Sequence, residues 1–502
     1  TDTYDTIEWL LKNVRGHNGR VGLYGISYPG FYTSAGIIDA HPALKAASPQ
    51  APIADWFIGD DFHHNGALYL AHFFNFSYTF GQPRPELTTK RNERLEPGTA
   101  DGYEFFQRVV PLSGVNERYY KNRIAFWNEI VEHPDYDAFW KARNLPQHLR
   151  AIKPAVMTVG GWFDAEDLYG ALETYEAAEE QGAASNILVM GPWSHGGWAR
   201  TEGSKLGDVD FRQKTGPFYR EFIELPFFEY HLKGIGRLDL PEAFVFETGR
   251  NEWKRYDAWP PKSARAKTLY LQPGGALTWD AKAEDRAPSI FAPRNGAYDE
   301  YVSDPAKPVP FSDAIAIGMT REHMVADQRL QSRRPDVLTY VTDPLENDVT
   351  LAGPVRPHLF VSTSGTDADF IVKLIDVYPD EMPSLEPNPC GIQLGGYQQL
   401  VRGEAFRGRY RKSFETPEPF EPGAVAEIEY EMPDVNHTFR RGHRIMVQVQ
   451  STWFPLIDIN PQTFVPNIYR AKVEDFRKAT HRVYHAPGQQ SGVTVSVVGA
   501  GD

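Results

Sequence analysis

The pattern of apolar and polar positions in the first 60 residues predicts alternating helices and strands. Apolar positions at helical spacing in TDTYDTIEWLLKNV predict an opening helix. The short apolar run VGLYGIS at residues 21–27 is interrupted by glycines and predicts a buried strand. A helical pattern in FYTSAGIID follows at once, and ALKAASPQAPI predicts a second strand. This order indicates the first part of an α/β domain.

The pattern changes twice further along the chain. Residues 66–150 carry aromatic-rich helical patterns such as YLAHFFNFSYTF, which predict a helical cap inserted into the α/β domain. The strand–helix alternation returns over residues 151–240, with strands in VMTVGG and NILVMG. From residue 241 to 502, β-like runs alternate with Gly, Pro and Asp turns. Many short strands with few helices predict a jelly-roll β-sandwich domain there.

Composition narrows the class of protein. A chain of 502 residues is too long for one ordinary core, which agrees with several domains. The formal net charge of −14 argues against a nucleic-acid partner, because such proteins need a basic face. No apolar run is long enough to span a bilayer, so we expect no membrane partner. The single cysteine, Cys390, excludes an internal disulfide.

A serine stands where the first predicted strand meets its helix. Ser27 lies between Gly25 and Gly30, and glycines allow the sharp turn that this position requires. Strand, serine turn and helix form the geometry of a nucleophile elbow, although an ordinary turn with a structural serine is the alternative. The elbow strand is normally central in its sheet, whereas only 26 residues precede this serine. We therefore expect further N-terminal strands to precede the sequence given.

Two more strand ends supply partners for an activated serine. Such a serine needs a base, and the base needs an acid to orient it. Asp164 follows the strand in VMTVGG, and His195 follows the strand in NILVMG. The carboxyl ends of neighbouring parallel strands meet at one edge, so all three side chains should gather there. Alone, Asp164 also fits a helix N-cap and His195 a structural loop residue; together with Ser27 they predict a catalytic triad.

These segments resemble those of a known family. GISYPG, GGWFDAEDLYG and GPWSHGG are similar to the signature segments of the CocE/NonD hydrolases, which include bacterial cocaine esterases, glutaryl acylases and α-amino-acid ester hydrolases. GRNEWKRYDAWPP resembles the opening of their jelly-roll domain, which X-prolyl dipeptidyl aminopeptidases share. The resemblance implies an α/β-hydrolase fold whose N-terminal strands are missing from this chain, a helical cap and a C-terminal β jelly roll.

The resemblance also implies roles for individual residues. Ser27 is then the nucleophile, His195 the general base and Asp164 the acid that orients it. The backbone N–H of Tyr28 is one oxyanion donor. The second donor in the family is a tyrosine hydroxyl from a segment upstream of this chain.

Four further carboxylates indicate which class of substrate the protein binds. Asp60 and Asp61 occur in FIGDDFHHNGA, and Glu166 and Asp167 occur in DAED. Carboxylates gathered at one pocket raise one another's pKa unless a cation compensates them. The α-amino-acid ester hydrolases have such a cluster, which binds the α-ammonium group of the substrate. By resemblance it consists here of Asp61, Glu166 and Asp167, with Asp60 as the alternative to Asp61. Glu166 and Asp167 would also simply favour a helix N-terminus.

The predicted function is that of a serine hydrolase acting on esters or amides of α-amino acids, including β-lactam antibiotics with an α-amino acyl side chain. The alternatives are a general carboxylesterase, a glutaryl or cephalosporin-type acylase, and a carbohydrate-binding jelly-roll protein. No cofactor and no metal are expected, because the adjacent His63 and His64 point to different sides of a helix or strand. The partner is a small-molecule ester or amide. The family suggests a homo-oligomer and a periplasmic or secreted location.

Overall fold

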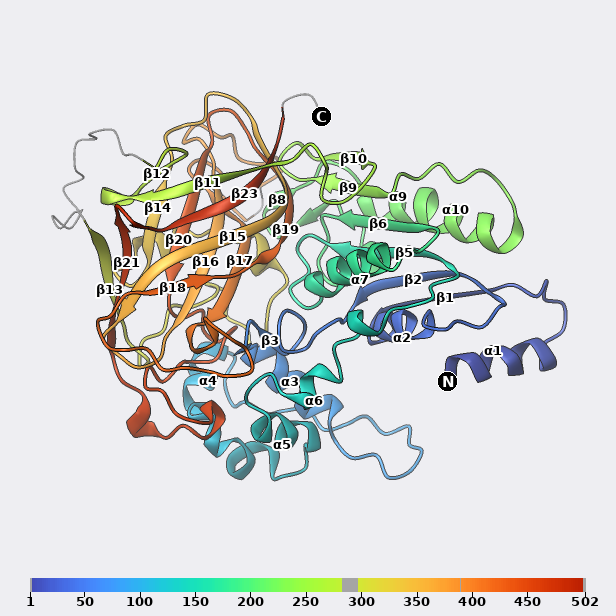
Figure 1. Cartoon of the computed structure of the whole chain (residues 1–502), viewed down its shortest axis with the longest axis horizontal. Coiled ribbons are helices and arrows are strands. Elements are labelled where there is room, and N and C mark those ends of the chain that lie inside the picture. Colours follow the sequence, from blue (N-terminus) through green and yellow to red (C-terminus); the bar gives the residue numbers. More distant parts are fainter. Residues whose placement is uncertain (1, 282–296, 389, 500–502) are drawn as a thin grey trace.

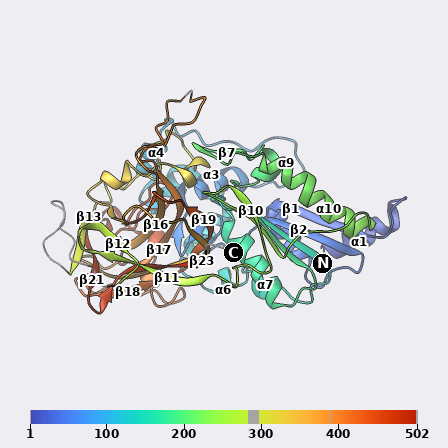
Figure 2. The same cartoon turned by 90° about the horizontal axis from the view of Figure 1, so that it is seen from above.

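The chain folds into an α/β part, a helical part and a β-rich part (Figure 1). The computed structural model describes residues 2–281, 297–388 and 390–499. The α/β and β-rich parts lie side by side, with helices α3 to α6 below their junction in Figure 1. Figure 2 shows from above that the two larger parts follow one another along the long axis. Within the described residues, no helix is both long enough and apolar enough to cross a membrane.

The α/β part is built on a six-stranded sheet with the strand order β1-β2-β5-β6-β9-β10. Neighbouring strands from β1 to β9 are parallel, and β10 is antiparallel to β9. The carboxyl ends of β1, β2, β5, β6 and β9 therefore share one edge. The strands are β1 (Val21–Ser27), β2 (Leu44–Pro52), β5 (Ala155–Gly161), β6 (Asn186–Gly191), β9 (Ala243–Glu247) and β10 (Glu252–Tyr256).

Helices cover both faces of this sheet. Every residue of β5 and β6 is buried, as expected for strands of a parallel sheet. In β6, Leu188 packs in one apolar cluster with residues of α7, whereas Val189 packs in another with the α9–α10 segment. The α-helices of this part are α1 (Asp2–Asn13), α2 (Tyr28–Gly36), α7 (Leu168–Glu180), α8 (Gly197–Arg200), α9 (Thr215–Tyr219) and α10 (Leu225–Phe228).

The first two strands after residue 240 pair with the α/β sheet. We predicted that the jelly roll begins at residue 241, yet β9 and β10 extend the α/β sheet to Tyr256. All five residues of β9, AFVFE, are buried. A short apolar strand of this kind fits a parallel sheet covered on both faces. From the sequence alone it could not be told from the antiparallel strands that follow.

The helical part has an aromatic core and reaches over the carboxyl edge of the sheet. Its buried rings include Phe73, Phe74, Tyr120 and Trp127. The ring of Phe76, on α3, stacks on the ring of Tyr28, the first residue of α2, with ring centroids 5.9 Å apart. The helices are α3 (Leu70–Phe80), α4 (Gly102–Val109), α5 (Ala125–Glu132) and α6 (Ala138–Lys141).

The β-rich part follows residue 256. Within the described residues its strands form a network ordered β13-β21-β15-β23-β11-β12-β14-β20-β16-β17, with β18 and β19 paired to β15 and β22 to β21. Its core is apolar and buried, as at Leu351, Val372 and Val447. The strands are β11 (Arg265–Gln272), β12 (Ala276–Thr278), β13 (Tyr298–Ser303), β14 (Leu338–Val341), β15 (Val349–Thr363), β16 (Asp369–Val377), β17 (Gln398–Arg407), β18 (Ala426–Glu429), β19 (Met432–Phe439), β20 (Arg444–Gln450), β21 (Ala479–Ala486), β22 (Gln489–Gln490) and β23 (Gly492–Val498).

Buried polar contacts join the β-rich part to the hairpin that follows Asp61. This hairpin consists of β3 (His63–His64) and β4 (Ala67–Leu68), and a second small hairpin consists of β7 (Lys205–Leu206) and β8 (Val209–Asp210). Arg407 on β17 pairs with Asp369 Oδ2 at 3.0 Å and with Asp458 Oδ1 at 2.6 Å. Asp458 Oδ1 also accepts a hydrogen bond from the backbone N–H of Leu68 at 3.0 Å. The β-rich part therefore helps to position the loop that carries Asp61.

Candidate active site

Ser27 occupies a strained turn between β1 and α2. Its φ of 68° and ψ of −125° lie outside the regions that a serine normally adopts. The two flanking glycines permit the close approach of the chain. A Cβ on Gly25 would lie 2.4 Å from Pro29 Cβ, and a Cβ on Gly30 would lie 2.5 Å from the Gln50 carbonyl oxygen. The spacing Gly-x-Ser-x-x-Gly is thus a steric requirement of this turn.

The turn directs the start of α2 at the space beside Ser27. α2 begins at Tyr28, and the first N–H groups of a helix have no partner within it. They lie at the positive end of the helix dipole, which favours negative charge. The position of the Tyr28 N–H is therefore compatible with the predicted role of oxyanion donor.

Asp164 and His195 lie at the same edge of the sheet and contact each other. Asp164 follows β5 and His195 follows β6. His195 Nδ1 is 2.9 Å from Asp164 Oδ2. Asp164 Oδ1 also accepts hydrogen bonds from the backbone N–H groups of Glu166 and Asp167, at 2.9 and 3.2 Å. Among the described residues, the hydroxyl of Ser27 makes no hydrogen bond to His195; in ligand-free sites such contacts are often long and tighten when the substrate binds.

Each member of this pair changes the pKa of the other. Burial alone would raise the pKa of Asp164, but the charge of His195 and the hydrogen bonds lower it below its ordinary value. Burial alone would lower the pKa of His195. The negative charges of Asp164 and Glu166, the hydrogen bond to Asp164 and the charge of Asp61 instead raise it to about 9.

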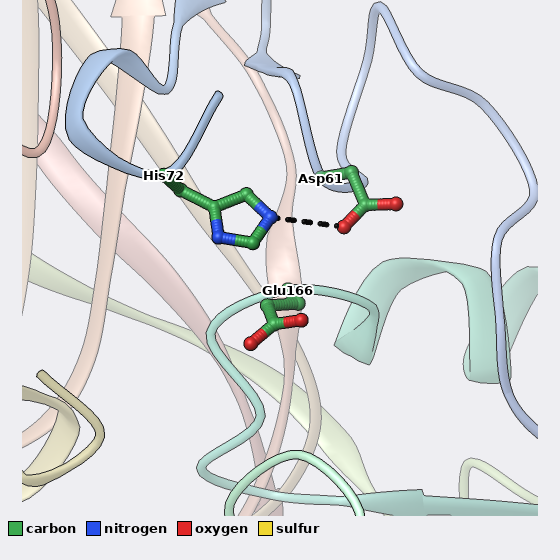
Figure 3. A group of neighbouring side chains, drawn as sticks. All are labelled: Asp61, His72 and Glu166. Carbon is green, nitrogen blue, oxygen red and sulfur yellow. Dashed lines mark hydrogen bonds and ion pairs between the residues drawn. The ribbon is translucent and has the colours of Figure 1, made fainter. Parts of the chain in front are cut away.

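Asp61 and Glu166 come from different segments and lie next to each other and to His72 (Figure 3). The backbone N–H of Asp61 donates to the Glu166 carbonyl at 2.9 Å, which ties the two loops together. Asp61 Oδ1 is 3.2 Å from His72 Nε2, and Asp61 Oδ2 accepts a hydrogen bond from Trp56 Nε1 at 3.4 Å. One carboxylate oxygen of Asp61, one of Glu166 and one ring nitrogen of His72 all lie within 4.8 Å of one another. The arrangement brings two carboxylates and one imidazole together around one point.

Asp167 is the most deeply buried member of the predicted cluster. It is 0% exposed, and neither of its carboxylate oxygens has a hydrogen-bond partner within the described part of the chain. Its Oδ2 lies 3.8 Å from His195 Nδ1. Burial, followed by the charges of Asp61, Asp60, Asp164 and Glu166, raises its pKa well above the ordinary value. A buried carboxyl group without a partner is costly, which favours a site that a ligand completes.

Asp60, the alternative to Asp61, has a different environment. Its Oδ2 accepts hydrogen bonds from the N–H groups of Ala54 and Asp55, at 2.7 and 2.9 Å. Its Oδ1 accepts one from the N–H of Gly170 at 2.7 Å. With three donors bound, Asp60 connects the end of β2 to the first turn of α7. The structure thus places Asp61, rather than Asp60, beside Glu166.

The adjacent His63 and His64 contact different partners. His63 contacts the Trp56 carbonyl through Nδ1 and the Tyr469 hydroxyl through Nε2, at 2.9 and 2.7 Å. His64 Nδ1 is 2.8 Å from Glu404 Oε1. Their ring nitrogens therefore do not converge on one point.

Residues of α3 border the site and were not predicted from the sequence. His72, Phe76 and Phe80 are spaced four residues apart, so they lie on one face of the helix. Phe76 and Phe80 both stack on Tyr28, and Trp56 lies 6.2 Å from it between ring centroids. The four-residue spacing is the sequence feature that could have indicated a helix face at the site. In an aromatic-rich helix, however, the same spacing indicates core packing equally well.

A strained serine at a strand–helix turn and a His–Asp pair at the same edge of a parallel sheet define the protein as a serine hydrolase of the α/β-hydrolase class. Comparison with known proteins supports this class. Residues 1–197 match the X-Pro dipeptidyl-peptidase (S15) family, and residues 236–494 match the X-Pro dipeptidyl-peptidase C-terminal non-catalytic domain. The chain belongs to this family of serine hydrolases, in its CocE/NonD group.

Solved structures and a characterised enzyme agree with this membership. An aminopeptidase from a marine sediment Thaumarchaeota archaeon is 40% identical, with a TM-score of 0.90 over 99% of this chain and 80% of that one. An α-amino acid ester hydrolase is 39% identical, with a TM-score of 0.89 and the same coverage. The cocaine esterase of a Rhodococcus species is 29% identical over 99% of this chain and 84% of its own length. The predicted family resemblance and fold class are confirmed.

Proposed function

We propose that this serine hydrolase cleaves esters or amides of α-amino acids through an acyl-enzyme on Ser27. His195 is the general base, Asp164 orients it, and the Tyr28 N–H is an oxyanion donor. Asp61, Glu166 and Asp167 bind the α-ammonium group of the substrate. The observation that carries this proposal is the buried carboxylate cluster beside His195, in which Asp167 has no hydrogen-bond partner among the described residues.

The reaction follows from these positions. Ser27 Oγ attacks the acyl carbon while His195 Nε2 takes its proton, and the oxyanion that forms faces the N-terminus of α2. Collapse of the intermediate breaks the bond to the alcohol or amine, which leaves with the proton from His195. A water molecule then attacks the acyl-enzyme by the same route. The ammonium bound by Asp61 and Glu166 holds the acyl carbon in place during both steps.

The surroundings favour an aromatic or bulky acyl side chain. Tyr28, Trp56, Phe76 and Phe80 lie next to the elbow and the carboxylates. β-Lactam antibiotics with an α-amino acyl side chain belong to this substrate class. The two solved relatives at about 40% identity are an aminopeptidase and an α-amino acid ester hydrolase, and both names denote a free α-amino group. A glutaryl acyl group carries a carboxylate, which the cluster would repel.

The cocaine esterase relative keeps a second candidate open, namely an esterase that does not recognise an amine. Phenylglycine methyl ester and phenylacetic acid methyl ester differ only in the amino group, so their kcat/KM values separate the two functions. The wild type should prefer phenylglycine methyl ester. Asp61→Asn should lose about 10- to 100-fold of kcat/KM on that ester, because a charged hydrogen bond is worth about 1.5–3 kcal/mol.

The same substitution should cause no loss on phenylacetic acid methyl ester. Asp39→Asn is the matched control, because Asp39 is an exposed carboxylate paired with Arg150. It should leave both kcat/KM values unchanged. Equal wild-type kcat/KM values on the two esters would contradict amine recognition and support an esterase that does not recognise an amine.

The role of Ser27 has its own test. A fluorophosphonate probe should label the wild type at Ser27, and Ser27→Ala should abolish the labelling and lower turnover by at least roughly 1000-fold. Ser34→Ala, a buried serine in the same helix, is the control and should keep both. Labelling at another serine, with activity kept in Ser27→Ala, would contradict the assignment.

A further inference from the structure

Glu166 lies at the ring nitrogen of His195 that faces away from Asp164. Asp164 contacts Nδ1 at 2.9 Å, whereas Glu166 Oε2 is 3.6 Å from Nε2. That distance is too long for a hydrogen bond, but a carboxylate and an imidazolium still attract each other strongly across it. Nε2 is the nitrogen on which a triad base accepts the serine proton. The proposed role of His195 requires Ser27 to donate to this same nitrogen, which Glu166 faces.

Titratable groups face His195 from three segments. Asp164, Glu166 and Asp167 come from the loop between β5 and α7, Asp61 from the loop after β2, and His72 from α3. Burial raises the pKa of Asp167, which favours its neutral form. The hydroxyls of Tyr28 and Tyr69 nearby also have raised pKa values, chiefly through burial, and stay neutral. The negative charge around His195 thus comes from Asp61, Asp164 and Glu166, with His72 shared between Asp61 and Glu166.

We propose that Glu166 holds the proton on His195 Nε2 until the ammonium group of the substrate binds Glu166, so that the substrate itself releases the catalytic base. This inference rests on the proposed function. The ammonium adds one positive charge to the cluster, and the imidazolium loses its Nε2 proton to solvent. The neutral ring then accepts the proton of Ser27 as Oγ bonds to the acyl carbon. It passes that proton to the alcohol when the ester C–O bond breaks.

The charge balance gives the direction of the effect. With a pKa of about 9, His195 in the free enzyme is mostly protonated below pH 9, so only the small neutral fraction can act as a base there. A positive charge among the carboxylates opposes the protonated form and lowers that pKa. A unit charge at roughly 6 Å, with an effective dielectric constant of about 20, lowers the pKa by about two. A substrate without an amino group leaves the pKa high.

The first experiment compares the pH dependence of kcat for the two esters in the wild type. Saturating kcat reports the pKa of the base in the enzyme–substrate complex, so titration of the free substrate amine does not enter. The acidic limb is the pH range in which kcat falls as the base becomes protonated. For phenylacetic acid methyl ester its midpoint should lie near pH 9. For phenylglycine methyl ester it should lie near pH 7, about two pH units lower. Coincident limbs would overturn the proposal.

Glu166→Gln tests the residue itself. It removes the charge at Nε2, so the acidic limb on phenylacetic acid methyl ester should move to lower pH. The rate on this ester at pH 7.5 should then rise about 10-fold, because below the pKa the fraction of neutral His195 grows tenfold when the pKa falls by one. The amino ester should instead lose kcat/KM. A merely structural role for Glu166 would lower both rates and leave the limb in place, which would also overturn the proposal.

Glu173→Gln is the matched control. Glu173 is a partly buried glutamate on α7 whose carboxylate faces Glu176, Glu431 and Asp434 rather than His195. This substitution should leave the acidic limb of both esters where it is. A limb that moved equally in both variants would show a general charge effect and remove the special role of Glu166.

A measurement on the wild type keeps the proposal testable if Glu166→Gln does not fold. Ammonium chloride, compared with sodium chloride at equal ionic strength, should compete with phenylglycine methyl ester and accelerate phenylacetic acid methyl ester at pH 7.5. Competition without acceleration would overturn the coupling. The two proposals fail in different ways. If the proposed function is wrong, the wild type shows no preference for the amino ester. If only the coupling is wrong, the preference remains and the acidic limbs of the two esters coincide.

Discussion

Asp60 and Asp61 are neighbours in the sequence with opposite environments. Asp60 is fully buried, and three backbone N–H groups, including that of Gly170, occupy its carboxylate. Asp61 has a positive φ of 42°, which turns its side chain toward His72 and Glu166 instead. One carboxylate therefore fixes the scaffold and the other faces the site. Substituting them should change different properties of the protein.

Asp60→Asn should lower the free energy of unfolding by about 1–3 kcal/mol. An amide has one acceptor oxygen, so at least one buried N–H at the end of β2 or the start of α7 loses its partner. Urea denaturation measures the change. Asp61→Asn, one residue away, is the control and should change stability less, because its partners are side chains that line the site. A larger loss from Asp61→Asn would contradict this account of Asp60.

The positions of some site residues could be predicted from the sequence, whereas those of others could not. Ser27, Asp164 and His195 could be placed at one edge because each follows a short apolar run that forms a strand. The choice of Asp61 over Asp60 came only from family resemblance, since the deciding bond to Gly170 joins residues far apart in the chain. His72 was missed because local periodicity does not reveal how α3 crosses the sheet edge.

At the scale of elements, the elbow depends on how closely α2 approaches β2. A Cβ on Gly30 would lie 2.5 Å from the Gln50 carbonyl oxygen and 3.1 Å from Pro52 Cα. Gly30→Ala should therefore push α2 away from β2. The expected cost is about 1–3 kcal/mol in stability and on the order of 100-fold in the rate of fluorophosphonate labelling.

Gly318→Ala is the control for this change. A Cβ there would meet only the amide nitrogen of Asn75, at an ordinary 3.6 Å. This variant should keep the stability and the labelling rate of the wild type. Wild-type labelling in Gly30→Ala would show that the turn tolerates a side chain, contrary to our steric argument.

The elements themselves were predicted unevenly. The strands of the α/β part stood out because short apolar runs end at glycine or polar residues, as β6 does at Gly191. The sequence prediction grouped β9 and β10 with the strands that follow, whereas in the structure β9 pairs with β6 and β10 pairs with β9, a pairing that tertiary packing selects. A strand carries no local record of whether its neighbour is parallel or antiparallel when both of its faces are buried.

At the scale of the whole molecule, the stability of the site depends on charges in the β-rich part. Arg407→Met would leave Asp369 and Asp458 buried without their cation. Removing one partner of a buried ion pair typically costs about 3–5 kcal/mol. We expect a loss of this size in urea denaturation, together with weaker binding of amino esters, because Asp458 holds the N–H of Leu68 in the hairpin after Asp61.

Arg356→Met is the surface counterpart. Arg356 pairs with Glu431 at 2.7 Å, with both side chains about half exposed. Exposed pairs of this kind contribute about 0–1 kcal/mol, so this variant should unfold close to the wild type. Similar losses from the two substitutions would contradict the role given to the buried network.

The pairing of β9 with β6 affects how the molecule responds to proteolytic cleavage and how it unfolds. The chain leaves the α/β sheet only after Tyr256, and one apolar cluster combines Leu188 and Phe246 from that sheet with Ala352 and Val498 from the β-rich part. Cleavage near residue 240 would therefore not release two intact modules. It would remove β9, one of the two neighbours of β6, and leave a fully buried strand as an exposed, aggregation-prone edge. Unfolding should accordingly be cooperative across both parts, and the molecule should melt as one unit in spite of its size.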